Sequence, residues 1–367
     1  MDFEKFEKLK IGDLEASIPI IQGGMAVGIS LSGLASAVAN AGGIGVIGTA
    51  GIGMLQSDSA RNFNDANKVG LRKEIRKAKK LTNGIIGVNI MVALTDFEDM
   101  VRVAVEEEAD LVFLGAGLPL RGLDTLVQGL EKKKKTKIVP IVSSSRAAKI
   151  IFNYWKKNYR YVPDAVVVEG PMAGGHLGFK KVQIDNKAFT LEKILPEVIL
   201  AIKPYEKEFN KNIPIIAAGG IFTGADIHKY LQMGAKGVQM ATRFVATLEC
   251  DASEKFKEAY VKCGKDDLTI IASPVGLPGR AIKNQFLKEV AAGQRKPFKC
   301  SWKCLKTCNY KTAPYCIALA LTNAQRGMLN RGFAFAGSNA YRVEKISSVC
   351  EVIQHLFEEY KIALKNK

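Results

Sequence analysis

The side chain with the clearest chemical potential is His176, within the glycine-rich segment AGGHLG. The chain has only three histidines, and the other two, His228 and His355, fall in helix-like segments where structural or surface roles are expected. An imidazole on a loop can give or take a proton near neutral pH. The alternative interpretation is that His176 caps a turn and has a structural role. The long strand-to-helix loop that carries His176 favours a catalytic role, because such loops usually carry function.

Two neighbouring segments have the composition of a phosphate site. Gly219 and Gly220 follow the apolar run IPIIAA, and the run Gln239–Thr242 ends the next apolar segment. Glycines let a phosphate approach backbone N–H groups closely, and Thr242 adds a hydroxyl donor. A plain tight turn explains the glycine pair taken alone. Its pairing with the end of the next strand favours phosphate binding.

Several further residues, either polar or without a bulky side chain, would suit contact with a ligand that contains a flat ring system. Gly23, Gly24 and Met25 offer exposed backbone after an apolar run. Asn89 stands in an otherwise apolar segment, where a buried amide needs a partner in a ligand or a neighbouring loop. Glu169 ends a run of valines, where an unpaired carboxylate would be costly.

These residues follow eight short apolar runs that alternate with helix-length segments. Such alternation indicates βα units and a parallel sheet. Eight units in about 250 residues predict a TIM (β/α)8 barrel, whose active site lies at the carboxyl ends of the strands. The expected strands are Pro19–Gln22, Gly43–Ile47, Ile85–Ile90, Leu111–Leu114, Lys137–Val142, Ala165–Val168, Ile213–Ala217 and Gly237–Met240.

The chain divides into three predicted parts. Residues 1–249 form the cofactor-binding barrel, with a helix or cap over 1–16. Residues 250–334 are predicted to be a helical insertion after strand eight. They contain no clear strand, and their position would suit a lid. Residues 335–367 form a loop and an amphipathic helix over 345–361 that returns to the barrel. The other expected helices span 32–40, 65–81, 96–108, 122–133, 146–158, 191–207 and 223–233.

Four of the seven cysteines, Cys300, Cys304, Cys308 and Cys316, lie in the predicted insertion. If their segment is helical, the first three thiols share one face. Converging thiolates could bind zinc or an iron–sulfur cluster, although the spacing matches neither common pattern. Packed thiols are the alternative, and nearby lysines would favour redox sensitivity. An odd number of cysteines without an export signal makes a disulfide framework unexpected.

The bulk composition is that of a globular protein, with 47% hydrophobic and 24% charged residues in a chain of 367. No apolar run approaches the ~20 residues of a membrane span, and the charged N-terminus lacks a secretory core, so a cytoplasmic location is expected. The net charge of +17 is scattered, and the densest run, Lys132–Lys135, fits a solvated helix end. Neither a nucleic acid nor a membrane is an expected partner.

Seven segments carry a family resemblance: PIIQGGMA, GVNIM, GAGLP, EGPMAGGHLG, IAAGGI, QMATRFVATLE and RAIKNQF. They cover roughly residues 15–290, and FAGSNAYRV is a looser match. Together they resemble the nitronate monooxygenase family, formerly the 2-nitropropane dioxygenases, and its relative, the flavin-dependent enoyl-acyl-carrier-protein reductase II. Many members carry Gln where Glu169 stands and Gly where Ala241 stands.

The resemblance implies a TIM barrel that binds FMN, with His176 as the catalytic base of nitronate oxidation. Alkyl nitronates would give carbonyl compounds and nitrite with O2. The alternative is an enoyl-acyl-carrier-protein reductase, with NAD(P)H as co-substrate and acyl carrier protein as partner. A non-catalytic flavin-binding subunit is a further alternative, and a homodimer is a candidate assembly. The expected cofactor-binding residues, from the residues and the resemblance together, are Gly23, Gly24, Met25, Asn89, Glu169, Gly174, Gly175, Gly219, Gly220, Gln239, Met240, Ala241 and Thr242.

Overall fold

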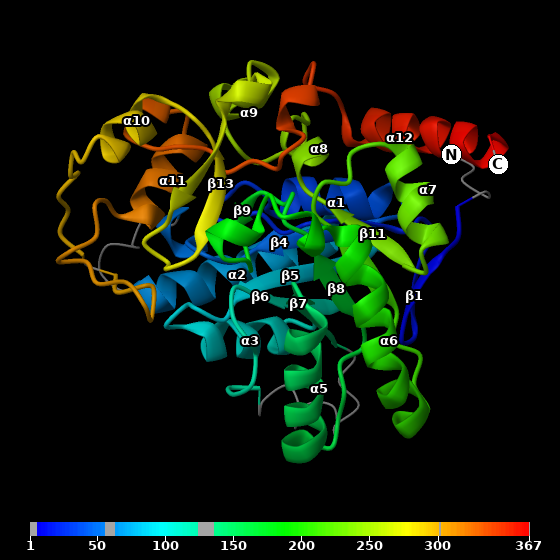
Figure 1. Ribbon diagram of the computed structural model, residues 1–367. Coiled ribbons are helices and arrows are strands. Elements are labelled where there is room, and N and C mark those ends of the chain that lie inside the picture. The colour runs from blue at the N-terminus through cyan, green and yellow to red at the C-terminus, as the bar shows by residue number, and fades with distance from the viewer. Residues whose placement is uncertain (1–5, 56–62, 124–135, 301, 367) are drawn as a thin grey trace.

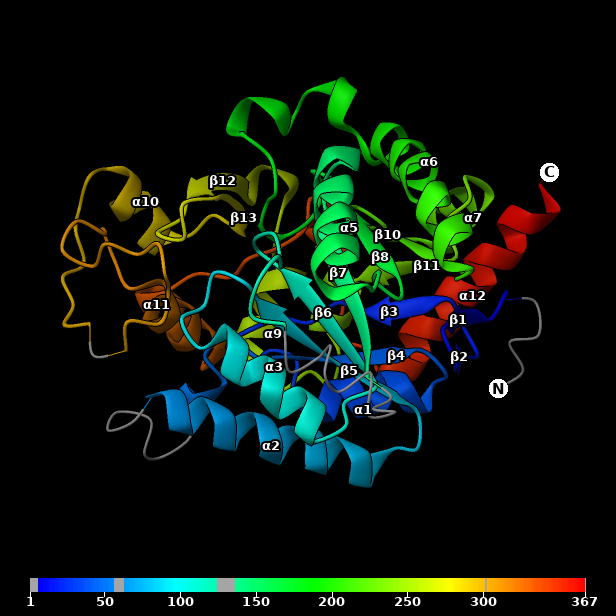
Figure 2. The same ribbon diagram turned by 90° about the horizontal axis from the view of Figure 1, so that it is seen from below.

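Eight parallel strands close into a barrel at the centre of the molecule (Figures 1 and 2). The structure is a computed structural model and describes residues 6–55, 63–123, 136–300 and 302–366. Around the barrel the strands follow the order β10-β11-β3-β4-β5-β6-β7-β8. The TIM barrel and all eight expected strands are confirmed. Their bounds are β3 Ile20–Gln22, β4 Ile44–Gly48, β5 Ile85–Met91, β6 Leu111–Gly115, β7 Lys137–Val142, β8 Val166–Glu169, β10 Ile215–Ala218 and β11 Gly237–Met240.

The strand register sorts side chains between the barrel interior and the surrounding helices. Side chains alternate along a strand, and paired residues of neighbouring strands point the same way. The interior is a separate apolar cluster that includes Ile21, Phe113 and Ala218. Ala218 pairs with Glu169 on one side and with Gln239 on the other, and Phe113 pairs with Asn89. At the carboxyl end of the strands, therefore, the interior layer changes from aliphatic to polar.

Helices cover the outside of the barrel, and α12 closes the ring against α7 (Figure 1). Most described helices lie close to their predicted ranges, whereas nearly all of the helix expected over 122–133 lies outside the described residues. The last helix begins at residue 349, not 345, because Ser348 and Glu351 form a reciprocal capping box. The bounds are α1 Ser32–Asn40, α2 Phe63–Leu81, α3 Phe97–Glu106, α5 Ser145–Tyr159, α6 Leu191–Phe209, α7 Gly224–Gln232 and α12 Val349–Lys365.

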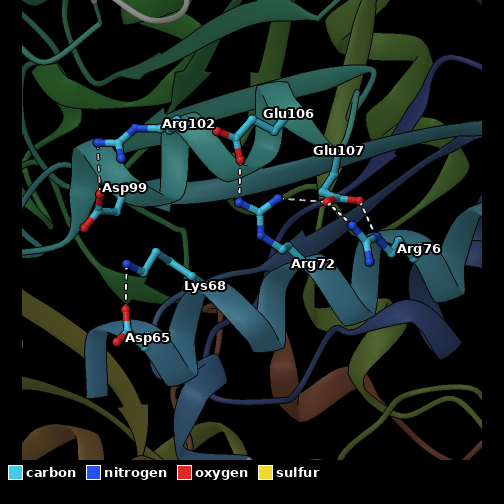
Figure 3. Close-up of polar contacts among 8 residues, drawn as sticks. All are labelled: Asp65, Lys68, Arg72, Arg76, Asp99, Arg102, Glu106 and Glu107. Carbon is cyan, nitrogen blue, oxygen red and sulfur yellow. Dashed lines mark hydrogen bonds and ion pairs between the residues drawn. The ribbon is translucent and has the colours of Figure 1, made fainter. Parts of the chain in front are cut away.

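Some of the basic side chains form ion pairs between helices α2 and α3 (Figure 3). Arg72 contacts both Glu106 and Glu107, and Arg76 reaches Glu107 at 2.7 Å. The guanidinium of Arg76, followed by that of Arg72, holds the pKa of Glu107 below its ordinary value. Exposed pairs of this kind contribute little to stability, about 0–1 kcal/mol each. Arg72 and Arg76 therefore serve to connect helix α2 to the end of helix α3.

The N-terminal segment forms a hairpin, so the helix alternative of the predicted helix or cap is wrong for the described residues 6–16. Strand β1 (Leu9–Ile11) pairs antiparallel with β2 (Leu14–Ala16) through a turn at Gly12, whose φ is +60°. Leu9, Ile11 and Ala16 are buried. That burial follows a period of two, which suits a strand and not a helix. Residues 1–5 are not described.

The insertion is only partly helical, so the expectation of no strand within residues 250–334 is wrong. It contains α9 (Glu254–Val261), α10 (Gln285–Ala291) and α11 (Ile317–Gln325), and also the antiparallel strands β12 (Leu268–Ala272) and β13 (Pro278–Ile282). The β-branched run TII favours β12, and the turn-rich residues between the two strands form the hairpin tip. Strand β13 also pairs with β9 (Gly175–His176). The insertion is thereby joined to the segment that carries His176.

The cysteine-bearing segment is a loop, so the shared helical face expected for Cys300, Cys304 and Cys308 does not exist. Its backbone pairs instead with the loop after β5, through a Leu94–Leu305 bridge and a 3.1 Å hydrogen bond from Thr95 N–H to the Cys304 carbonyl. Backbone groups bonded to a neighbouring loop are not available for the hydrogen bonds of a helix. None of the seven cysteines, all of which lie in the described ranges, forms a disulfide. Within the described ranges, no group of three or more His, Cys, Asp or Glu side chains is arranged to hold a metal ion.

Across the residues described, none of the helices combines the length and the apolar character that crossing a bilayer demands.

Candidate functional site

A cavity of about 300 Å³ opens at the carboxyl ends of the barrel strands. We call it the barrel cavity. Its wall includes His176 and every residue that the sequence predicts for cofactor binding, from Gly23 through to Thr242. Of the four cysteines proposed as metal ligands, only Cys304 lines it. The structure therefore brings the predicted cofactor residues together and leaves most of the cysteine loop outside.

One side of the barrel cavity is built from backbone N–H groups. Gly219 and Gly220 have φ values of +90° and +89°, a conformation that a side chain would strain. A Cβ at Gly219 would also lie 2.7 Å from the Gly170 carbonyl oxygen. Among the described residues, the N–H groups of Gly219, Gly220, Ala241 and Gly337 have no hydrogen-bond partner. We call these four the amide cradle, and a phosphate is the ligand that such a group of donors favours.

The C-terminal loop completes the amide cradle. Asn339 donates a 2.6 Å hydrogen bond from Nδ2 to the Gly220 carbonyl, and the Ser338 N–H donates to the Met172 carbonyl at 3.1 Å. A Cβ at Gly337 would lie 2.7 Å from Thr242 Oγ1. The segment FAGSNAYRV was noted only for its loose resemblance, and these three residues were missed as site residues. Their proximity depends on a chain return of about one hundred residues, which local sequence does not reveal.

Next to the amide cradle, the ends of the adjacent strands offer bare backbone and amide side chains. At Gly24 a Cβ would lie 2.4 Å from Asn89 Cβ, so only glycine fits there. Gln239 Oε1 is buried and has no hydrogen-bond partner in the part of the chain that the structure describes. A buried unpaired acceptor is unfavourable. A ligand N–H in the barrel cavity would supply the missing donor.

Glu169 faces the barrel cavity from the end of β8. Burial raises the pKa of this carboxyl group to about 7. Among the described residues that line the cavity there is no Lys or Arg side chain to oppose that effect. At neutral pH a large share of Glu169 is therefore an uncharged acid that can donate a hydrogen bond, as an amide would.

His176 is held on two sides by parts of the chain far from it in sequence. Its Nε2 lies 2.7 Å from Ser273 Oγ at the tip of the β12–β13 hairpin, and its ring meets Phe335 edge-on at 4.9 Å. Desolvation lowers the pKa of His176 to about 4. The ring is therefore neutral near pH 7. Sequence reasoning did not single out Ser273 or Phe335, because only the fold brings them to the histidine.

The part of the barrel cavity that borders the insertion, here called the outer end, is apolar. It is lined by side chains from the insertion and from the loop after β5, which also form a separate hydrophobic cluster. This end would suit an alkyl or acyl group. Its apolar residues include Leu94, Val275, Leu305, Ile317 and Leu321.

Fold and site together are those of a TIM-barrel protein with unpartnered backbone N–H groups at the rim where the strands end. The chain belongs to the nitronate monooxygenase family, whose model matches residues 8–359. This family is flavin-dependent. The fold and the position of the amide cradle agree with that membership.

Two groups of curated proteins are similar in sequence. A "(3aS,4S,5R,7aS)-5-hydroxy-7a-methyl-1-oxo-octahydro-1H-indene-4-carboxyl-CoA dehydrogenase" of Mycobacterium tuberculosis is 28% identical over 277 residues, 76% of this chain and 66% of the relative. The alignment thus spans just under two thirds of that protein. A "probable nitronate monooxygenase" of Staphylococcus aureus is 27% identical over 308 residues, 76% of this chain and 79% of the relative.

Two solved structures are similar over nearly the whole chain. FabK from Thermotoga maritima has a TM-score of 0.73 and 28% identity, with coverage of 96% of this chain and 95% of FabK. The nitroalkane oxidase from Streptomyces ansochromogenes has a TM-score of 0.72, with coverage of 96% and 98%. Its identity is 21%, so that likeness concerns the fold alone.

Proposed function

We propose that the chain binds FMN in the barrel cavity and oxidises alkyl nitronates to carbonyl compounds and nitrite with O2. The observation that carries the proposal is the coincidence, in one cavity, of the amide cradle, the unpaired acceptor Gln239 Oε1 and His176. The cradle fits the phosphate of FMN. Gln239 and Glu169 suit hydrogen bonding to the polar edge of a flavin ring. Gly23 and Gly24 expose backbone against which the face of the ring can lie.

Bound FMN would supply the electron transfer, which no amino-acid side chain here can provide. The protein's part is to orient the substrate and exclude water. His176, neutral at pH 7, is the proposed contact for the nitro group or the α-carbon of the substrate. The apolar outer end, with Leu305 and Leu321, would take the alkyl part.

Reduction of an enoyl thioester, with NAD(P)H as reductant, is the second candidate. It is favoured by the apolar outer end of the cavity and by the 28% identity to FabK over 96% of the chain. Basic residues of the insertion would suit an acidic acyl carrier protein as partner. They are Lys283, Lys288, Arg295, Lys296 and Lys299.

Anaerobic mixing of FMN-loaded protein tests the two candidates against each other. Bleaching of the flavin absorbance by an alkyl nitronate, but not by NADH or NADPH, is the expected result. Rapid bleaching by NADH or NADPH, followed by reoxidation with an enoyl thioester, would select the reductase. Bound FMN that neither reductant bleaches would indicate a non-catalytic flavin-binding subunit. Protein that does not bind FMN would overturn all three.

A further inference from the structure

His176 and Ser273 form a side-chain pair that joins the barrel rim to the insertion. The Nε2–Oγ distance is 2.7 Å across 97 residues of sequence. Ser273 is buried, with 8% of its surface exposed. Its backbone is held in the hairpin tip, since its N–H donates to the Leu277 carbonyl and its carbonyl accepts from the Gly276 N–H at 2.9 Å. The serine hydroxyl therefore occupies a defined position beside the imidazole.

A count of protons sets the direction of this hydrogen bond. A serine hydroxyl has one hydrogen to donate and two lone pairs to accept with. One lone pair accepts the Val275 N–H at 3.2 Å. Among the described residues, the only acceptor in contact with Ser273 Oγ is His176 Nε2. If Nε2–H donated to the serine instead, the buried hydroxyl hydrogen would have no acceptor, which is unfavourable.

We infer that Ser273 is a positioning residue that donates to Nε2 and thereby holds His176 as the Nδ1–H tautomer, so that the ring meets the substrate as a hydrogen-bond donor. A neutral imidazole has one donor and one acceptor nitrogen. With Nε2 already accepting, the general-base role implied by the family resemblance gives way to donation from Nδ1. This inference deepens the proposed function and rests on it for the identity of the substrate.

The surroundings of the pair support a donor role. His176 lines the barrel cavity, whereas Ser273 does not. Because Nε2 is occupied by the serine, Nδ1 is the ring nitrogen left for a ligand. The described lining residues include no Lys or Arg side chain. A nitronate oxygen or a thioester carbonyl oxygen in this cavity would therefore need a neutral N–H donor, and in such a site a fixed donor acts strongly on developing negative charge.

Nitrogen NMR of the full-length protein labelled with ¹⁵N-histidine tests the inference without turnover. The chain has three histidines, and H176N assigns the His176 signals by their loss. At pH 7 we expect an unprotonated Nε2 and a protonated Nδ1. S273A should shift the tautomer population toward Nε2–H, and S273T, which keeps the hydroxyl, should preserve it. T269A in the same hairpin serves as the matched control and should leave the spectrum unchanged.

Two outcomes would overturn the inference: a proton on Nε2 in the wild-type protein, or an unchanged tautomer population in S273A. Neither depends on FMN, so they are distinguishable from failure of the proposed function, which appears as loss of flavin binding or of turnover in the wild type. If the donor role holds, S273A should lower kcat about tenfold or more with a smaller change in KM, and S273T should restore it.

Discussion

The side chain of Asn339 donates a 2.6 Å hydrogen bond to the backbone carbonyl of Gly220. The donor lies in the C-terminal loop, and the acceptor follows barrel strand β10. This bond holds the C-terminal loop against the glycine pair at the carboxyl end of the barrel. The amide cradle therefore depends on residues that are distant in sequence.

Replacing Asn339 by Ala should weaken FMN binding about five- to tenfold, because a net hydrogen bond of about 1 kcal/mol is lost. Fluorescence titration of the apoprotein with FMN measures the effect. N323A is the matched control, since Asn323 also donates to a backbone carbonyl, that of Arg331, but does not line the cavity. Equal affinities for N339A and wild type would exclude the C-terminal loop from cofactor binding.

Replacing Gly219 by Ala should abolish measurable FMN binding and lower the free energy of unfolding by about 1–3 kcal/mol. The alanine would be strained at a φ of +90° and would clash with the Gly170 carbonyl. G293A provides the comparison, because Gly293 has a φ of +86° with open space around it. Thermal unfolding of both variants separates backbone strain from loss of the cradle. FMN affinity should survive in G293A; full affinity in G219A would contradict the assigned cradle.

Glu169 should make FMN affinity fall as pH rises through about 7, the pKa to which burial raises its carboxyl group. Below that pH the side chain is an uncharged donor, and above it an unpaired anion would face the ligand. E169Q should bind FMN with little pH dependence over the same range. Titrations about one unit either side of pH 7 measure this. Parallel pH profiles for the two proteins would refute it.

Protonation of Glu169 also makes the free energy of unfolding depend on pH. The folded protein keeps this proton up to about pH 7, whereas the unfolded chain releases it near 4.5. Between these values the folded state binds more protons, so its free energy of unfolding decreases as pH rises. Chemical denaturation measures this effect. The free energies of unfolding of wild type and E169Q should converge at the acidic end of this range and separate toward pH 7. A difference that instead grew toward acid would show that the direction of the shift is wrong.

Replacing His176 by Ala should lower kcat about 100-fold or more, the usual cost of removing one fixed donor to developing charge. H176N should retain more activity, because an amide nitrogen can also donate. FMN absorbance should be preserved in both variants, which checks that the site remains assembled. Equal and complete loss in both variants would favour a proton-transfer role. Unchanged turnover in H176A would remove His176 from the reaction.

The barrel was predictable because each strand is a short apolar run, and those runs remain recognisable without tertiary context. The predicted cofactor residues lie in one cavity because the ends of parallel strands meet at one rim. By contrast, the hairpin at residues 9–16 was expected to be a helix or cap, because its charged residues obscure a period of two. The β12–β13 hairpin was missed because its turn-rich tip was read as an interruption between helices.

The contacts around His176 and the cradle were beyond sequence reasoning for a different reason. Ser273 and Asn339 act through partners about one hundred residues away, and nothing in their neighbours marks them. The pKa of His176 likewise depends on how much water the assembled cavity excludes. Such properties arise from the packing of whole segments.

The amide cradle takes one of its four N–H groups from Gly337, close to the end of the chain. A nascent chain that already contains all eight barrel strands therefore still lacks one N–H group of the amide cradle. Translation must continue from β11 as far as Gly337 before all four donors exist. A chain truncated after β11 would lack the fourth donor.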